Sequence, residues 1–222
     1  MDKNYCIFDM DGTLVDSMGY WLGMEHDYLI SRGAKPGPAL EALIERLKPM
    51  TLYDAAQAFI AELGFSGPPE QIIADMNAVM AENYRLRVPL KPDVAEYLTI
   101  LRGRGAKLCT ASATITPLVK MTLDRLGIGH LFDFMLSCVD VGASKDRPDV
   151  YFAAAARMGA KPEEVAVFED SLQALTTAKK AGFYAVAVRD DASASDWPAL
   201  CALADETVES WAEAARSLRA KD

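Results

Sequence analysis

The chain has 222 residues, of which 51% are hydrophobic and 25% charged, a composition typical of a globular protein and not of a disordered one. Its formal net charge of −9 argues against nucleic acid or an anionic membrane as the main partner, because both bind clustered Lys and Arg. The four cysteines form no CxxC pair and there are only two histidines, which argues against a zinc finger. We expect four buried thiols in a cytoplasmic protein.

The first predicted element is a buried strand at residues 5–8, an apolar run that ends in acidic residues. The stretch that follows it contains no convincing strand. It contains four helical patterns separated by turn signals at 33–37, 48–49 and 64–69; the patterns lie at 20–31, 39–47, 53–63 and 70–84. We therefore expect residues 17–88 to form a helical domain inserted after the first strand.

Beyond residue 88, short apolar runs alternate with helical patterns. The runs lie at 107–111, 134–138, 165–168 and 184–188, and the helical patterns at 92–103, 116–126 and 150–158. Such alternation predicts an α/β fold, a Rossmann-like parallel sheet with helices on both faces. This core would comprise residues 1–16 and 89–222.

Polar residues follow the predicted strands at the end where parallel sheets bind ligands. Four acids, one hydroxyl and one lysine would meet there: Asp9, Asp11, Ser112, Lys145, Glu169 and Asp170. Clustered carboxylates without His or Cys suit Mg²⁺ better than Zn²⁺. One carboxylate could attack phosphorus and a second could protonate the leaving oxygen, while the hydroxyl and the lysine bind phosphoryl oxygens. The pattern predicts phosphoryl transfer.

The motifs resemble those of the haloacid dehalogenase superfamily, in particular the phosphatase branch that includes β-phosphoglucomutase. Four stretches carry the resemblance: DMDGTLVDS at 9–17, a serine at 112 after an apolar run, KDRPD at 145–149 and EDS at 169–171. Thr110 is the other hydroxyl near the second motif, but the family's spacing favours Ser112 and leaves Thr110 within the strand.

The resemblance implies that Asp9 is the nucleophile and Asp11 the general acid and base. It implies that Mg²⁺ is held by Asp9, the main-chain carbonyl of Asp11 and Asp170, with Glu169 bound directly or through water. It further implies that phosphate is held by the side chains of Ser112 and Lys145. Three main-chain N–H groups would hold it as well, those of Met10, Asp11 and Ala113. Residues 17–88 would be a C1-type cap that closes over the substrate.

Two activities remain open within this branch. The family's mutases carry a His after a Tyr in the first cap helix, where this chain has Tyr20 and Trp21, and a phosphate-binding cap Arg that has no match at residues 47–51. We therefore expect a phosphatase that hydrolyses a small phosphorylated metabolite, as a monomer or weak dimer, with a sugar-phosphate mutase as the alternative. A signalling receiver domain uses similar residues but lacks the first motif and any helical insertion, so these two features argue against a receiver domain here.

Overall fold

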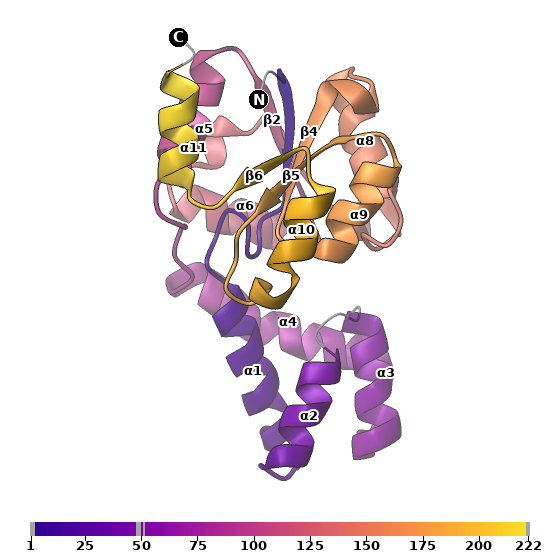
Figure 1. Ribbon diagram of the computed structural model, residues 1–222. Helices are drawn as coiled ribbons and strands as arrows, with labels where there is room; N and C mark the ends of the chain where they lie inside the picture. The colour runs from indigo at the N-terminus through magenta and orange to yellow at the C-terminus, as the bar shows by residue number, and fades with distance from the viewer. Residues whose placement is uncertain (1–2, 48–49, 51, 221–222) are drawn as a thin grey trace. The chain divides into compact units, whose positions relative to one another are not determined.

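A computed structural model describes residues 3–47, 50 and 52–220 (Figure 1). The predicted turn at 48–49 lies outside these residues. The chain divides into two compact units: Met18–Val88 forms the smaller one, and the residues before and after it form the larger one. Ser17, which we expected in the insertion, belongs to the larger unit, where its hydroxyl donates a hydrogen bond to Asp11.

The larger unit is built on a parallel sheet, which confirms the predicted fold class. Within the described residues its six strands are ordered β3-β2-β1-β4-β5-β6. Their bounds are β1 Tyr5–Phe8, β2 Lys107–Ser112, β3 Phe134–Ser137, β4 Val165–Glu169, β5 Tyr184–Val188 and β6 Glu206–Val208. The sequence did not predict β6, because its three residues are too few and too polar to stand out as an apolar run.

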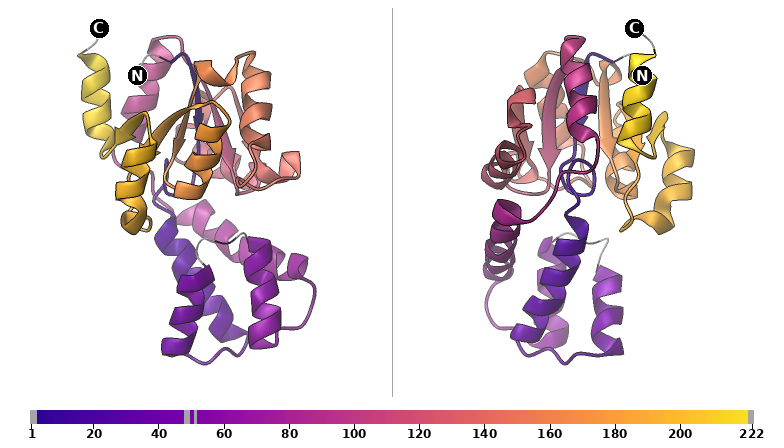
Figure 2. Two further views of the ribbon diagram at one scale, coloured as in Figure 1. Left: turned by 45° about the vertical axis from the view of Figure 1, so that its right-hand side comes forward. Right: turned by 90° about the vertical axis from the view of Figure 1, so that its left-hand side faces the viewer.

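Helices cover both faces of this sheet (Figures 1 and 2). The larger unit contains α5 Val94–Gly103, α6 Thr116–Arg125, α7 Cys138–Val141, α8 Asp149–Met158, α9 Leu172–Lys180, α10 Trp197–Leu203 and α11 Trp211–Arg219. Successive strand residues point to opposite faces, so Ile7 packs with the α8 side chains and Phe8 packs toward Trp211 of α11. On the α11 side the rings of Phe8 and Phe168 are stacked with centroids 4.3 Å apart.

The register of the strands decides which residues meet at the carboxyl edge of the sheet. Phe8, the last residue of β1, pairs with Phe168 of β4 on one side and with Thr110 of β2 on the other. The main-chain N–H of Asp9 continues the pairing and donates to the Phe168 carbonyl at 3.0 Å. The residues that follow β1, β2 and β4 therefore emerge side by side.

The two connections to the helical unit leave the larger unit from neighbouring points. Val15 forms an antiparallel bridge with Leu90. The N–H of Asp16 donates to the Pro89 carbonyl at 3.0 Å. This pairing holds the end of the first motif against the segment that returns from the helical unit.

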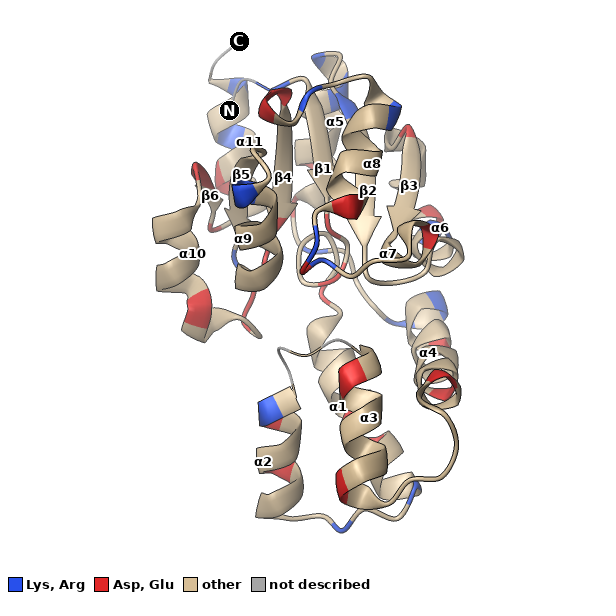
Figure 3. Cartoon of the chain, turned by 90° about the vertical axis from the view of Figure 1, so that its right-hand side faces the viewer, with Lys and Arg blue, Asp and Glu red and all other residues tan. Residues whose placement is uncertain are grey.

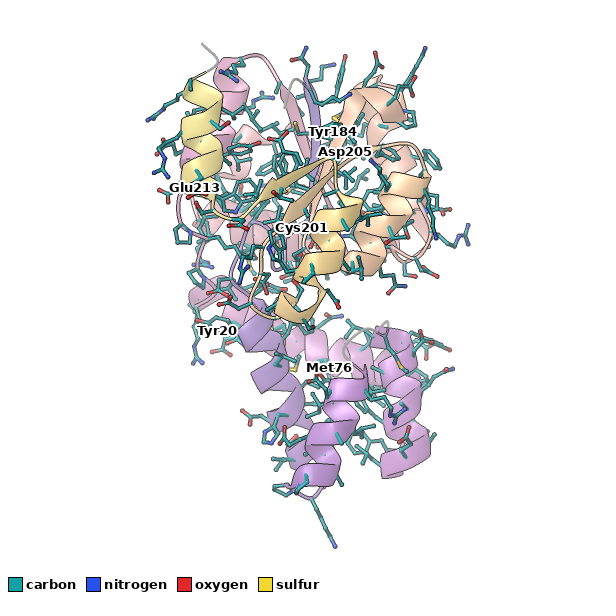
Figure 4. All side chains as sticks on the ribbon, in the orientation of Figure 1. Tyr20, Met76, Tyr184, Cys201, Asp205 and Glu213 are labelled. Carbon is teal, nitrogen blue, oxygen red and sulfur yellow. The ribbon has the colours of Figure 1, made fainter. Side chains whose placement is uncertain are left out.

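The smaller unit contains four helices in its described part: α1 Met18–Ser31, α2 Pro38–Leu47, α3 Leu52–Leu63 and α4 Pro69–Leu86. Each coincides with a predicted helix to within two residues at either end. Its interior is formed by residues such as Phe59, Ile72 and Met76, which are almost fully buried. Met76 is labelled in Figure 4. The unit thus has a hydrophobic core of its own.

The expectation of four buried thiols is wrong at one position. Cys6, Cys109 and Cys138 are buried, but Cys201 is exposed on α10 (Figure 4). Its neighbour Leu200 takes the core-facing position of that helix, so the next residue points to solvent. None of the described helices has the length and apolar character that crossing a membrane requires.

Candidate active site

Lys145 lies between two buried carboxylates at the carboxyl edge of the sheet. Its Nζ is 2.5 Å from Oδ1 of Asp9 and 2.6 Å from Oε1 of Glu169. Asp9 follows β1, Glu169 ends β4, and Lys145 comes from the loop between α7 and α8. Figure 3 shows acidic and basic segments meeting at this edge. Burial lowers the pKa of the Lys145 ammonium, but the two carboxylates raise it by more, so the net shift keeps Lys145 charged.

Asp170 adds a third carboxylate to this cluster. One oxygen from each of Asp9, Glu169 and Asp170 lies within 4.8 Å of the other two, and among the described residues no other His, Cys, Asp or Glu side chains form such a group. Burial raises the pKa of Asp9 well above its usual range; Lys145 opposes the shift, and the neighbouring carboxylates add to it. Three oxygen donors and no nitrogen or sulfur form a site that fits a hard divalent cation such as Mg²⁺.

The first motif, which follows the neighbouring strand β1, holds Asp170 in place. Thr13 Oγ1 donates to Asp170 Oδ1 at 2.9 Å. Gly12 has a φ of +77°, and a Cβ at this position would overlap the Asp170 carboxylate. Glycine is therefore required at position 12 both for the left-handed backbone and for the close approach of the carboxylate.

Two hydroxyls hold the carboxylate of Asp11. Ser17 Oγ donates to Oδ1 at 2.6 Å, and Thr114 Oγ1 donates to Oδ2 at 2.8 Å. The Asp11 side chain lies outside the group of three carboxylates that could hold a cation. Both oxygens of Asp11 thus accept hydrogen bonds from neutral hydroxyls, whereas Asp9 is in direct contact with the Lys145 ammonium.

Ser112 is linked to Asp11 through the loop that follows β2. It is the last residue of β2, one residue beyond the predicted end of that strand, and is fully buried. Its Oγ accepts a hydrogen bond from the Thr114 N–H at 3.0 Å, and the exposed Ala113 lies between them. Thr110 lies inside the strand, as expected.

Four side chains that contact this site were not predicted from the sequence. Thr13 and Ser17 lie inside the first motif and could have been identified from it. Thr114 lies two residues beyond Ser112 and had no motif to mark it. Tyr151, whose hydroxyl donates to Glu169 Oε1 at 2.9 Å, falls at apolar helical spacing on α8 and looks like a core residue. Burial raises the pKa of Tyr151 well above its usual value, and the nearby Glu169 carboxylate adds to this, so its hydroxyl remains protonated.

The chain is similar to known proteins both in sequence and in structure. A family model described as haloacid dehalogenase-like hydrolase matches residues 3–182. Protein CbbY of Rhodobacter capsulatus is 28% identical over 225 residues, covering 94% of this chain and 98% of that protein. Hexitol phosphatase B of Escherichia coli K12 is 28% identical over 187 residues, covering 82% of each chain. The crystal structure of a putative β-phosphoglucomutase from Thermotoga maritima has a TM-score of 0.73 at 24% identity, covering 98% of this chain and 99% of that one.

The close contact at Gly12 can be tested against a matched glycine. Gly12→Ala and Gly159→Ala both place a side chain at a positive φ, +77° and +74°, which costs about 1 kcal/mol or more. No atom lies within 4 Å of a Cβ at Gly159, whereas a Cβ at Gly12 would meet Asp170. We expect Gly12→Ala to lower the urea midpoint of unfolding further than Gly159→Ala. Equal losses of the urea midpoint in the two variants would show that the position of Asp170 does not require the absence of a Cβ at residue 12.

The titration of Asp170 gives a second prediction. Burial, with Glu169 and Asp190 adding to it, raises the pKa of Asp170 to about 7, above the ~3.9 of an unfolded carboxyl. The folded state then holds this proton more tightly than the unfolded state does, and the protonated carboxyl stabilises the fold. This stabilisation is present in full below about pH 4 and is lost as the pH rises through about 7. In EDTA, Asp170→Asn should become more stable relative to the wild type between about pH 5 and about pH 8, measured by thermal unfolding. A difference that does not vary with pH would contradict the raised pKa.

Proposed function

The chain belongs to the haloacid dehalogenase-like hydrolases and is a phosphatase-type hydrolase, and on this basis we propose that it hydrolyses a small organic phosphate monoester with Mg²⁺ through a phosphorylated Asp9. The observation that supports this most is the position of the Asp9 carboxylate. It is buried and contacts the Lys145 ammonium, and one of its oxygens lies within 4.8 Å of oxygens from two further carboxylates. A nucleophilic carboxylate, a cation-binding group and a phosphate-binding ammonium are then in contact.

Mg²⁺ would be held by Asp9, Glu169 and Asp170, together with the main-chain carbonyl of Asp11. The oxygen-only donor set and its burial support this assignment. When bound, the ion shields the negative charge of the phosphoryl group and of the surrounding carboxylates. Lys145 supplies a second positive charge, so together they offset a cluster of carboxylates that would otherwise repel a phosphate dianion.

The reaction requires two steps at the two aspartates. An oxygen of Asp9 attacks phosphorus, the bond from phosphorus to the ester oxygen breaks, and Asp11 donates a proton to the leaving alcohol. Asp11 then takes a proton from water as the water oxygen attacks the phosphorus of the aspartyl phosphate, which releases phosphate and restores Asp9. The hydroxyls of Ser17 and Thr114 fix the Asp11 carboxylate in both steps.

The non-bridging phosphoryl oxygens would be bound by Ser112 and Lys145 and by the main-chain N–H groups of Met10, Asp11 and Ala113. These groups come from the ends of β1 and β2 and from the loop before α8. Donors placed in advance around the phosphoryl group stabilise the charge that develops during transfer.

We assign the helical unit, residues 18–88, as the cap that selects the substrate. The mutases of this branch have a histidine where this chain has Trp21. The indole N–H of Trp21 donates to the Tyr84 hydroxyl at 2.8 Å. An indole has no titratable group for acid–base chemistry, which favours hydrolysis over phosphoryl transfer between sugars. The similarity to hexitol phosphatase B makes sugar-alcohol phosphates the first substrates to test.

The proposed function predicts Mg²⁺-dependent release of inorganic phosphate from p-nitrophenyl phosphate and from sugar or sugar-alcohol phosphates. EDTA should abolish the activity, and Mg²⁺ should restore it. Asp9→Asn should lower kcat on the order of 10³-fold or more, because the amide is a poor nucleophile.

The control is Asp124→Asn, a change at an exposed carboxylate on α6 that is paired with Lys120, which should leave kcat unchanged. Full activity in EDTA or in Asp9→Asn would contradict the mechanism. Interconversion of glucose phosphates with a bisphosphate activator, without net phosphate release, would replace hydrolysis by the mutase reaction.

A further inference from the structure

Tyr151 is a buried polar residue whose hydroxyl serves no packing purpose. It lies on the core-facing side of α8, is fully buried, and its ring packs against Phe183 with centroids 6.0 Å apart. Phenylalanine would fill the same volume without a hydroxyl to be desolvated. A buried hydroxyl costs free energy unless it is hydrogen-bonded, and here its partner is Glu169.

The bond from Tyr151 reaches the same oxygen of Glu169 as Lys145 does. Oε1 accepts from Lys145 Nζ at 2.6 Å and from the Tyr151 hydroxyl at 2.9 Å. No described residue donates a hydrogen bond to the other oxygen, Oε2. Two donors on one oxygen fix the rotation of the carboxylate and leave Oε2 available to a cation.

The two donors differ in what else they contact. Lys145 is shared between Glu169 and Asp9, so its ammonium is attracted to both carboxylates and is not held by Glu169 alone. Tyr151 is held by the core of the larger unit and by α8 and makes its hydrogen bond to Glu169 alone. Without the tyrosine hydroxyl, the Glu169 carboxylate could rotate to place both oxygens on Lys145, which would take Oε2 away from a cation.

We propose that Tyr151 is a positioning residue of the cation site: its hydroxyl holds Glu169 Oε1 so that Oε2 remains free to bind a divalent cation. The inference rests on the proposed function, because it assigns Glu169 to the Mg²⁺ site. It adds a residue on α8, outside the strand-end motifs, to the determinants of metal affinity.

The test is Mg²⁺ binding to the full chain carrying Tyr151→Phe, measured by calorimetry without substrate and by the rise in unfolding temperature with added Mg²⁺. The ring and its packing remain, so the Mg²⁺-free variant should unfold cooperatively. Loss of a group that orients a metal ligand typically weakens metal binding 10- to 100-fold, and we expect about a 10-fold higher Kd. The half-saturating Mg²⁺ concentration in the phosphatase assay should rise by the same factor, with kcat at saturating Mg²⁺ within about twofold of wild type.

Tyr184→Phe is the matched control. Tyr184, labelled in Figure 4, lies on β5 of the same unit, and its hydroxyl donates to Glu206 of the edge strand β6 at 3.4 Å. This variant should bind Mg²⁺ as the wild type does. A similar loss of affinity in both variants would mean that removing any such hydroxyl loosens the unit, and would overturn the specific role of Tyr151.

Glu169→Gln gives an independent measurement. If Tyr151 acts through Glu169, adding Tyr151→Phe to Glu169→Gln should change Mg²⁺ affinity by less than about twofold. Wild-type affinity in Tyr151→Phe, or a full additional loss in the double variant, would overturn the inference while leaving the proposed function intact. A wild-type chain that neither binds Mg²⁺ nor releases phosphate would instead contradict the proposed function, and the inference with it.

Discussion

The contact of Lys145 with Asp9 and Glu169 is the interaction on which the site depends. Three buried carboxylates within 4.8 Å of one another repel strongly, and Lys145 is the cation that contacts two of them directly. The raised pKa values of Asp9 and Asp170 reflect the part of this repulsion and burial that Lys145 does not offset. A site in this condition gains stability from a second cation, so the binding of Mg²⁺ and the stability of the larger unit should be linked.

The parallel sheet makes this concentration of charge possible. Because β1 and β4 are adjacent and in register, Asp9 and Glu169 emerge at the same level, and Gly12 lets the first motif turn tightly against Asp170. The carboxylates emerge at the strand ends and are held there by hydrogen bonds from Thr13, Tyr151 and Lys145. Rigid placement of this kind matters for a reaction in which the protein mainly positions charges around a phosphoryl group.

Most of this architecture could be predicted from the sequence, because apolar runs followed by acids are visible without a structure. That signal located Asp9, Asp11, Glu169 and Asp170, and the helical insertion was evident from its periodicity. Other features carried no such signal. Tyr151 lies at core spacing, so its hydroxyl is informative only once Glu169 is seen beside it. Strand β6 is too short to form a pattern, and the outward direction of Cys201 depends on which helix face packs.

The most direct test of the account is to locate the phosphoryl group on the chain. Asp11→Asn should allow attack on an activated ester such as p-nitrophenyl phosphate but slow the reaction with water, because the amide cannot act as the base. Acid quenching during turnover with Mg²⁺, followed by peptide mass spectrometry, should then find one phosphoryl group, on Asp9. A phosphoryl group on another residue, or none on Asp9 while the ester is being hydrolysed, would contradict the proposed role of Asp9 beside Lys145.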